Sequence, residues 1–258
     1  MITNILKDKP TKLFIVLGGV FIANALIAEV IGVKLFSLEK LFGQTPFDFT
    51  FLGEGGLSFT LSAGVLIWPV VFISTDIINE YFGVRGVKYL SFLTAGLIAF
   101  AFIAFYLSIK LPSIDWWLPV NKSKGVPDMQ SAFSQILGQG MNIILGSISA
   151  FILGQIIDAT IFMKIKKITG EKYIWFRATF STVVSQFIDS FVVTFIAFYV
   201  FQGWSFPKVL AICLVGYSYK FVMAILMTPA VYLVHNLIEK YLGPELAHDM
   251  KLAALSKK

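Results

Sequence analysis

Two short motifs pair an amide with a carboxylate one helical turn apart. Gln155 precedes Asp158, and Gln186 precedes Asp189, by three residues in each case, so in a helix the two side chains of a motif share a face. A carboxylate accepts hydrogen bonds from two neighbouring N–H groups, and an amide offers both a donor and an acceptor. This set predicts a site for a planar ligand whose edge carries several N–H donors and one carbonyl, as guanine-like bases and pteridines do.

Both motifs stand in segments that are apolar enough to lie in a membrane. Hydrophobic residues make up 57% of the 258 residues and charged residues 14%, against about 25% charged in ordinary soluble domains. An ionised side chain in mid-bilayer costs at least about 2.5–3.5 kcal/mol. We therefore expect the motif side chains to face the bundle interior or a water-filled cavity. The alternative is that each Gln and Asp only hydrogen-bonds between helices.

Six segments reach the length of about 20 apolar residues that a bilayer requires. The predicted fold is all-α: a polytopic membrane bundle of six transmembrane helices that forms a single domain over residues 1–258. Residues 111–139, which contain Trp116 and Trp117, are predicted to hold a short interfacial helix with the Trp pair at headgroup depth. The six predicted spans are residues 13–33, 57–78, 87–109, 141–163, 179–201 and 209–237.

The distribution of basic residues predicts the orientation. Fourteen Lys and Arg residues flank one side of the predicted bundle and six flank the other, and the more basic side is normally cytoplasmic. Both termini are therefore predicted to be cytoplasmic, in a multi-pass protein of the cell inner (plasma) membrane. The apolar run after residue 12 is interpreted as the first span and not as a cleaved signal peptide.

The fourth and fifth predicted spans should be antiparallel neighbours, because a short loop joins them. Both motifs then lie in the cytoplasmic half of the membrane, and we expect their four side chains to converge on one pocket. The arrangement is typical of the inverted repeats of many transporters. Gly146, Ala150 and Gly154 recur every four residues and predict close helix packing beside Asp158.

Further polar residues interrupt two other spans. The second span ends with Asp76, Asn79 and Glu80 on one helix face, which indicates either a solvated helix end or part of a gate or binding site. Lys220 lies near the middle of the sixth span. A buried lysine needs a partner, and Asp158, Asp189 and Asp76 are the candidates. A structural salt bridge and a contact with substrate both remain open for Lys220.

Other function classes find no support in the sequence. The chain contains no metalloprotease, nucleophile-elbow or P-loop motif, so it is predicted not to be an enzyme or a self-contained ATP-driven pump. One cysteine, Cys213, and two separate histidines predict no metal site and no cofactor. The net charge of +6 is attributed to Lys and Arg residues in the loops, which set the orientation of a membrane protein. No nucleic-acid partner is therefore expected.

Together these residues resemble a known family. The run from Thr75 to Gly83, followed by the two Gln-x-x-Asp motifs, looks like the queuosine precursor transporter family, also called the vitamin uptake transporter family. The resemblance extends from the first span to the sixth. It implies six spanning helices and import of 7-cyano- and 7-aminomethyl-7-deazaguanine across the inner membrane. By similarity, the substrate-pocket or coupling residues would be Asp76, Asn79, Glu80, Gln155, Asp158, Gln186 and Asp189.

Several alternatives stay open at this point. Residues 37–56 and 111–139 are longer than the outer loops of compact family members, which leaves open the preferred precursor and a role for these loops as a lid. The chain could also be a substrate-capture subunit of an energy-coupling-factor type of vitamin or nucleobase transporter, or a membrane scaffold. The energy source, proton coupling or facilitated diffusion, is open, and so is a homo-oligomer.

Overall fold

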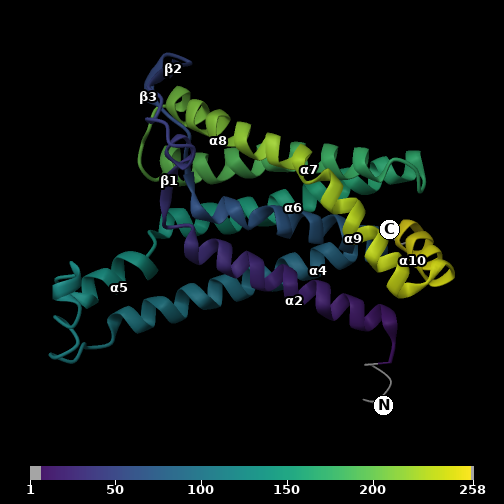
Figure 1. The fold of residues 1–258 in the computed structure, drawn as a ribbon, viewed down its shortest axis with the longest axis horizontal. Helices are drawn as coiled ribbons and strands as arrows, with labels where there is room; N and C mark the ends of the chain where they lie inside the picture. The colour runs from purple at the N-terminus through teal and green to yellow at the C-terminus, as the bar shows by residue number, and fades with distance from the viewer. Residues whose placement is uncertain (1–6, 257–258) are drawn as a thin grey trace.

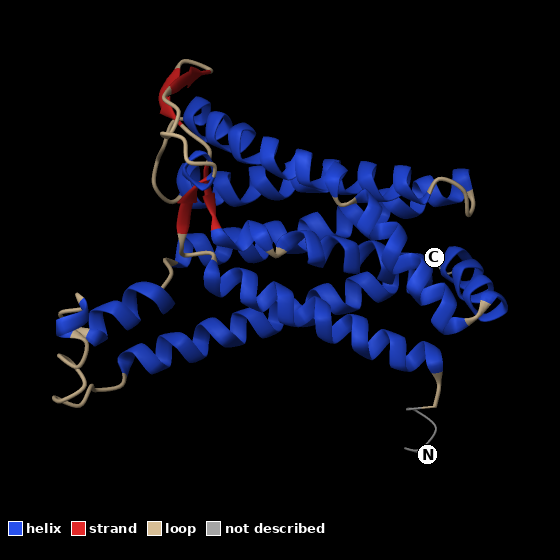
Figure 2. Ribbon diagram, viewed as in Figure 1, coloured by secondary structure: helices blue, strands red, loops and turns tan. Residues whose placement is uncertain are grey.

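The described part of the chain, residues 7–256 of this computed structural model, is mostly helical (Figure 1, Figure 2). Within it, five helical runs are long and apolar enough to cross a membrane. These are α2 (Lys9–Ile31), α4 (Trp68–Lys110), α5 (Met129–Leu137) with α6 (Met141–Thr169), α7 (Ile174–Thr194) with a π-helix (Phe195–Val200), and α8 (Phe206–Leu226). The all-α membrane bundle predicted from the sequence is confirmed.

The helix α4 contains two predicted spans. Its 43 residues would form a straight rod of about 64 Å at 1.5 Å per residue, which is about twice the thickness of the hydrocarbon core. Gly83 breaks it with φ 72° and ψ −178°, and the chain reverses direction there (Figure 1). Residues 68–82 and 84–110 therefore correspond to the second and third predicted spans. The total of six membrane crossings stays a prediction.

Two predicted boundaries are wrong. The second span was expected to begin at residue 57, but residues 54–62 are mainly extended and α4 begins at Trp68 and continues past Ile78. The sixth span, expected as one helix over 209–237, consists of α8 and a separate helix α9 (Thr228–Leu242). Pro229 stands in the first turn of α9, and a proline there cannot donate the backbone hydrogen bond that would continue α8.

A cap of short strands covers one end of the bundle. Strand β1 (Leu35–Ser37) pairs with β4 (Thr60–Ser62), and β2 (Phe49–Phe51) pairs with β3 (Glu54–Leu57), both antiparallel. The short helix α3 (Leu38–Leu41) and a 3-10 turn (Ala63–Leu66) complete this segment. The short helix expected within residues 111–139 is α5, which begins after an Asp128 cap and does not contain Trp116 or Trp117. Its interfacial position stays a prediction.

Both ends of the described chain lie at the opposite end of the bundle from the strands (Figure 1). The last helix, α10 (Pro244–Ser256), packs there against α4. This agrees with the predicted placement of both termini on one side, while the side of the membrane stays a prediction. Two of the basic residues used to predict it, Lys257 and Lys258, lie outside the described residues.

Small residues bring α6 and α7 close together, as their spacing predicted. A Cβ placed on Gly154 would lie 3.4 Å from Cβ of Asp189, and one on Gly146 would lie 3.2 Å from the Val193 carbonyl oxygen. Larger side chains would push the two helices apart.

Glu39 holds the strand cap together. Its carboxylate accepts hydrogen bonds from the Ser37 hydroxyl (2.7 Å) and from the backbone N–H groups of Phe59 (2.7 Å) and Phe47 (3.4 Å). Burial by itself would raise the pKa of Glu39, but these hydrogen bonds to the ionised form outweigh it and lower the pKa to about 2. The ionised carboxylate therefore ties segments that are distant in sequence into one cap.

Substitution of Gly83 tests the reversal in α4. We expect Gly83→Ala to lower the free energy of unfolding by about 1–3 kcal/mol, because its backbone conformation is nearly restricted to glycine. An added Cβ would also lie 3.1 Å from the carbonyl oxygen of Ala254 in α10. Denaturant unfolding in detergent micelles measures the change. The matched control is Gly96→Ala in the same helix, where nothing lies within 4 Å and alanine should not destabilise; equal losses in both variants would contradict the assignment.

The cap should loosen in acid. Because the pKa of Glu39 is lowered from 4.5 to about 2, its contribution to cap stability is fully present above about pH 4.5 and is lost as the pH falls towards 2. Hydrogen–deuterium exchange over residues 35–62 at pH 5 and pH 3, corrected for intrinsic rates, measures this. Glu39→Gln should show the loosened pattern already at pH 7, and Asp48→Asn, on an exposed residue, should not. Unchanged protection in Glu39→Gln would refute the role of this carboxylate.

Candidate functional site

Two buried hydrogen bonds set the register between α4 and α6. The Thr75 hydroxyl donates to the Gln155 side-chain oxygen at 2.7 Å, and the Asn79 amide donates to the Ala159 carbonyl at 2.9 Å. Since Thr75 and Asn79 are one turn apart, both face α6. This register fixes the rotation of the first half of α4 about its axis, and with it the direction in which Asp76 points.

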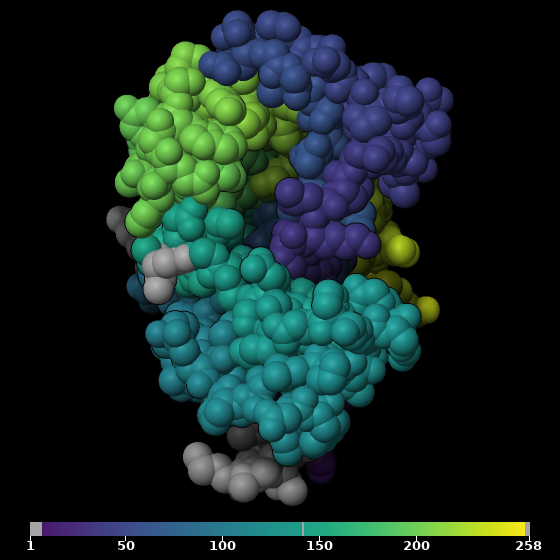
Figure 3. All heavy atoms as spheres, turned by 90° about the vertical axis from the view of Figure 1, so that its left-hand side faces the viewer, coloured from purple at the N-terminus to yellow at the C-terminus, as the bar shows by residue number. Residues whose placement is uncertain are grey.

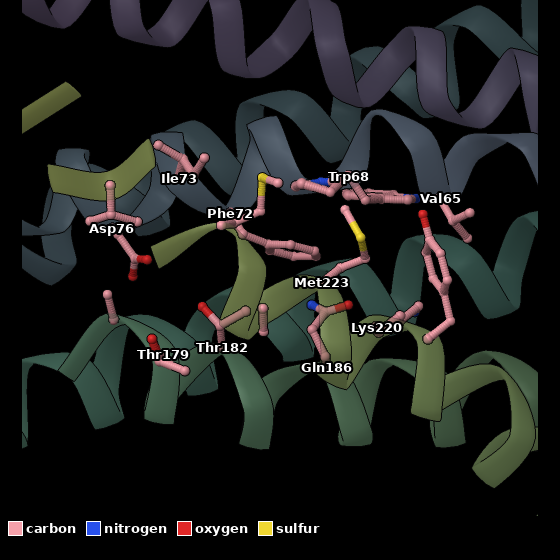
Figure 4. Close-up of a pocket in the computed structure, with 16 residues that line it drawn as sticks. Val65, Trp68, Phe72, Ile73, Asp76, Thr179, Thr182, Gln186, Lys220 and Met223 are labelled. Atoms are coloured by element: carbon pink, nitrogen blue, oxygen red, sulfur yellow. The ribbon is translucent and has the colours of Figure 1, made fainter. Parts of the chain in front are cut away.

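A cavity lies between α4, α7, α8 and the start of α9 (Figure 4). Its volume is about 40 Å³, and since about 10–15 Å³ by this measure holds one water, it has room for a few waters. Trp68 and Phe72 of α4 and Met223 of α8 form apolar walls. Its polar lining consists of Asp76, Thr179, Thr182, Gln186, Tyr219 and Lys220.

Asp76 and Gln186, which line this cavity, each carry an unpaired oxygen atom. Their residues are 3% and 2% exposed, and neither Asp76 Oδ1 nor Gln186 Oε1 accepts a hydrogen bond from any described residue. A buried acceptor without a partner costs about 1–3 kcal/mol, so such atoms are normally satisfied by water or a ligand. Both side chains therefore suit contact with a molecule in the cavity.

Lys220 is the cation on the cavity wall, and its partner is Asp189. The ammonium donates to Asp189 Oδ2 at 2.7 Å, with both side chains about one-fifth exposed. Asp189 itself does not line the cavity. Of the three partners that the sequence allowed for Lys220, the structure selects this one.

Asp158 lies behind the cavity. Its Oδ1 accepts from the Ser185 hydroxyl of α7 at 3.0 Å, whereas no residue in the described range donates to Oδ2. It is 1% exposed. Asp158 therefore links α6 to α7 beside the cavity.

Glu80 belongs to a buried ionic cluster near the ends of the chain. Its carboxylate lies 2.9 Å from Arg177 Nη2 and 3.2 Å from Lys166 Nζ, and all three side chains are at most 1% exposed. Next to it, the Tyr81 hydroxyl lies 3.1 Å from His235 Nδ1. The cluster joins α4, α6 and α7 at this end of the bundle, and the Tyr81–His235 contact adds α9.

Outside this cluster, Lys251 of α10 adds a second set of contacts. It lies 2.9 Å from Glu171 and 2.8 Å from Glu239. Hydrogen bonds and charge from Lys251 lower the pKa of Glu171 against the opposing effect of its burial. The terminal end is thus held by two layers of ion pairs.

The opposite end of the molecule is hollowed. Figure 3 shows a depression between α8, the strand segment and the end of α2. Val65 in the 3-10 turn and Trp68, the first residue of α4, line the cavity on that side. The bundle is therefore tightly closed at the terminal end and more open towards the strands.

The predicted site residues separate into two groups. Asp76, Gln186 and Lys220 line the cavity, whereas the other five are held in contacts between helices. The expectation that all four motif side chains converge on one pocket is not met, because the face of α6 that carries the first motif is covered by α4 and α7. The residues in helix contacts are Asn79, Glu80, Gln155, Asp158 and Asp189.

Sequence reasoning missed the polar stripe on α7. Thr179, Thr182 and Gln186 line the cavity together, and their spacing of three and four residues is the spacing of one helix face. That spacing is visible in the sequence and could have identified the face. Tyr219, adjacent to Lys220, also lines the cavity.

Comparison with known proteins identifies the family. A family model described as "Putative vitamin uptake transporter" matches residues 62–234, which is more than half of the chain. The chain belongs to the vitamin uptake transporter family. The matched range includes every residue that lines the cavity.

Two curated relatives carry the same name, "Probable queuosine precursor transporter". The one from Bacillus subtilis (strain 168) is 29% identical over 190 residues, which cover 71% of this chain and 74% of the relative. The one from Haemophilus influenzae (strain ATCC 51907 / DSM 11121 / KW20 / Rd) is 24% identical over 218 residues, which cover 80% and 84%. No solved structure matches the chain. This vitamin uptake transporter is a multi-pass protein of the plasma membrane and not an enzyme.

Removal of the Glu80 charge tests the ionic cluster of this transporter. We expect Glu80→Gln to destabilise the protein by about 3–5 kcal/mol, because Lys166 and Arg177 would keep buried charges without a counter-ion. Thermal unfolding in detergent measures the loss. Glu171→Gln is the matched control, since Glu171 is 41% exposed and exposed ion pairs contribute at most about 1 kcal/mol. Equal shifts in the two variants would show that the buried cluster is not the stabilising element.

Proposed function

We propose that this protein imports 7-deazaguanine precursors of queuosine, 7-cyano- and 7-aminomethyl-7-deazaguanine. The names of the two curated relatives support this substrate class. The observation that carries the proposal is the pair of unpaired oxygen atoms, Asp76 Oδ1 and Gln186 Oε1, on a cavity with aromatic walls.

A guanine-like edge matches the polar groups of the cavity. Its ring N–H and exocyclic amino group are adjacent donors, which one carboxylate accepts together, and the neighbouring carbonyl accepts from an amide or an ammonium. Asp76 would accept from these two donors, Lys220 would donate to the carbonyl, and Gln186 Oε1 would accept from a remaining N–H group of the base. Trp68 and Phe72 would pack against the ring, since aromatic rings favour offset or edge contacts.

Transport requires the helices around the cavity to move, because the cavity holds only a few waters. The break between α8 and α9 is placed for such a motion, since Met227 at the break and Val231 in α9 both line the cavity. Movement of α9 would open the terminal end, where the ionic cluster now closes the bundle. The hollowed strand end would then be the side of entry, which is the outer side by the predicted orientation.

The remaining motif residues would position this site. Gln155 holds α4 through Thr75, Asp158 holds α7 through Ser185, and Asp189 holds Lys220. Their roles would be indirect, so their loss should alter affinity through the placement of Asp76, Gln186 and Lys220. Asn79 and Glu80 would act on the helix register and on closure of the terminal end.

Uptake of labelled 7-cyano-7-deazaguanine tests the proposal in cells that neither make nor otherwise import the base. We expect Asp76→Asn to reduce uptake by about tenfold or more, because a hydrogen bond to a charged group contributes about 1.5–3 kcal/mol and about 1.4 kcal/mol is a factor of ten. Gln186→Ala should reduce uptake by about two- to tenfold, because a hydrogen bond to a neutral amide contributes about 0.5–1.5 kcal/mol. Asp115→Asn, on an exposed loop residue, should transport normally.

Membrane insertion of each variant is measured in the same cells, so that lost uptake is not lost protein. Full uptake by an inserted Asp76→Asn protein would exclude the proposed site. The purified chain alone in liposomes provides the second arm. Transport there supports an importer, whereas tight binding without transport would favour the capture-subunit alternative.

A further inference from the structure

The cavity is electrically polar along its length. Asp76 lies at one end, and Gln186 and Lys220 lie towards the other (Figure 4). Among the described residues lining the cavity, Asp76 is the single carboxylate and Lys220 the single cation. A ligand with donors on one side and acceptors on the other would therefore bind in one orientation.

We infer that Lys220 is a specificity-determining residue that selects 7-deazaguanines with a neutral, hydrogen-bond-accepting 7-substituent over those with an ammonium-bearing one. The inference rests on the proposed function, because it concerns the choice between two substrates of that class. It predicts that 7-cyano-7-deazaguanine is preferred to 7-aminomethyl-7-deazaguanine.

The orientation of the base follows from its chemistry. The ring N–H and the amino group lie on one side of the carbonyl, and the 7-substituent lies on the other side of it. When Asp76 accepts the two donors, the carbonyl and the 7-substituent both point towards the Lys220 end. Lys220 would therefore lie next to the part of the molecule in which the two precursors differ.

The charge facing that substituent is positive. The ammonium of Lys220 has three N–H donors, of which Asp189 accepts one at 2.7 Å. Asp189 partly neutralises the charge of Lys220, but Asp189 does not itself line the cavity. A nitrile nitrogen can accept a remaining N–H, whereas the ammonium of an aminomethyl group has no acceptor to offer and is repelled. Specificity of this kind arises from the repulsive element as much as from the attractive one.

The same ion pair could be purely structural. In that case Lys220 and Asp189 would only join α7 to α8, and changing their charge would alter the affinity for both bases equally. The two interpretations therefore differ in the ratio of the two affinities. A general structural defect would change both affinities and leave their ratio unchanged.

Equilibrium binding to purified full-length protein in lipid nanodiscs measures that ratio, with labelled 7-cyano-7-deazaguanine as probe and both unlabelled bases as competitors. We expect the wild type to bind the cyano base at least about tenfold more tightly, which corresponds to about 1.4 kcal/mol. Lys220→Gln should reduce the ratio to within about threefold, and Lys220→Arg should keep it, since a cation remains at the cavity. Asp189→Asn removes the offsetting charge and should widen the ratio.

Each outcome decides between the inference and the proposed function. Wild-type protein that binds neither base overturns both. Equal affinities, or a preference for the aminomethyl base, overturn the inference and leave the import function intact. A ratio that is unchanged in Lys220→Gln overturns it as well. If Lys220→Gln does not fold, Asp189→Asn decides: a wider ratio supports the inference and an unchanged ratio overturns it.

Discussion

The contact between α4 and α6 is the constraint on which the cavity depends. Thr75 and Asn79 hydrogen-bond to Gln155 and to the Ala159 carbonyl, and both bonds are buried away from water. Because unmade bonds at these positions would leave polar groups unpaired in an apolar interior, only one rotation of α4 is favourable. Asp76, between the two, is thereby directed away from the α6 contact and onto the cavity.

The acidic residues inside the bundle differ in whether a cation lies beside them. Glu80 has two cations within 3.2 Å and no place on the cavity, which suits a closure that must be broken for opening. Asp189 has Lys220, with part of both side chains still exposed. Asp76 has no hydrogen-bonded cation among the described residues, and it is the acid that reaches the cavity. Since burying an unpaired carboxylate is costly, retention of one at this place is more consistent with ligand binding than with stability.

The two ends of the bundle differ in how they are held. At the terminal end, ion pairs join helices that are far apart in sequence, and α10 packs over the reversal at Gly83. At the strand end, closure relies on a small cap held by one carboxylate, Glu39, and the surface is hollowed (Figure 3). The break between α8 and α9 lies beside the cavity, so a motion of α9 changes both the cavity and the ionic closure. Under the proposed import function, this asymmetry would let one end of the bundle open while the other stays closed.

The sequence by itself determined the class of protein and much of the chemistry. Long apolar segments predicted a helical membrane bundle, and the reason is general: a chain in lipid must satisfy its backbone within each helix. Polar residues in these segments identified Asp76, Gln186 and Lys220 as candidates, since a charge in lipid must be accommodated. The break in α8 and α9 was missed because apolar composition continues through Pro229, so hydropathy alone gave one long span.

Only the tertiary structure decided which of those residues face the cavity. Helical spacing puts Gln155 and Asp158 on one face, but it does not say whether that face meets a cavity or another helix. Here the neighbouring helices α4 and α7 cover it. The partner of Lys220 was likewise undetermined, since three acids were equivalent in sequence and one lies at 2.7 Å. The physical reason is that periodicity fixes directions within a helix, whereas the rotation of a helix against its neighbours is set by packing across the whole bundle.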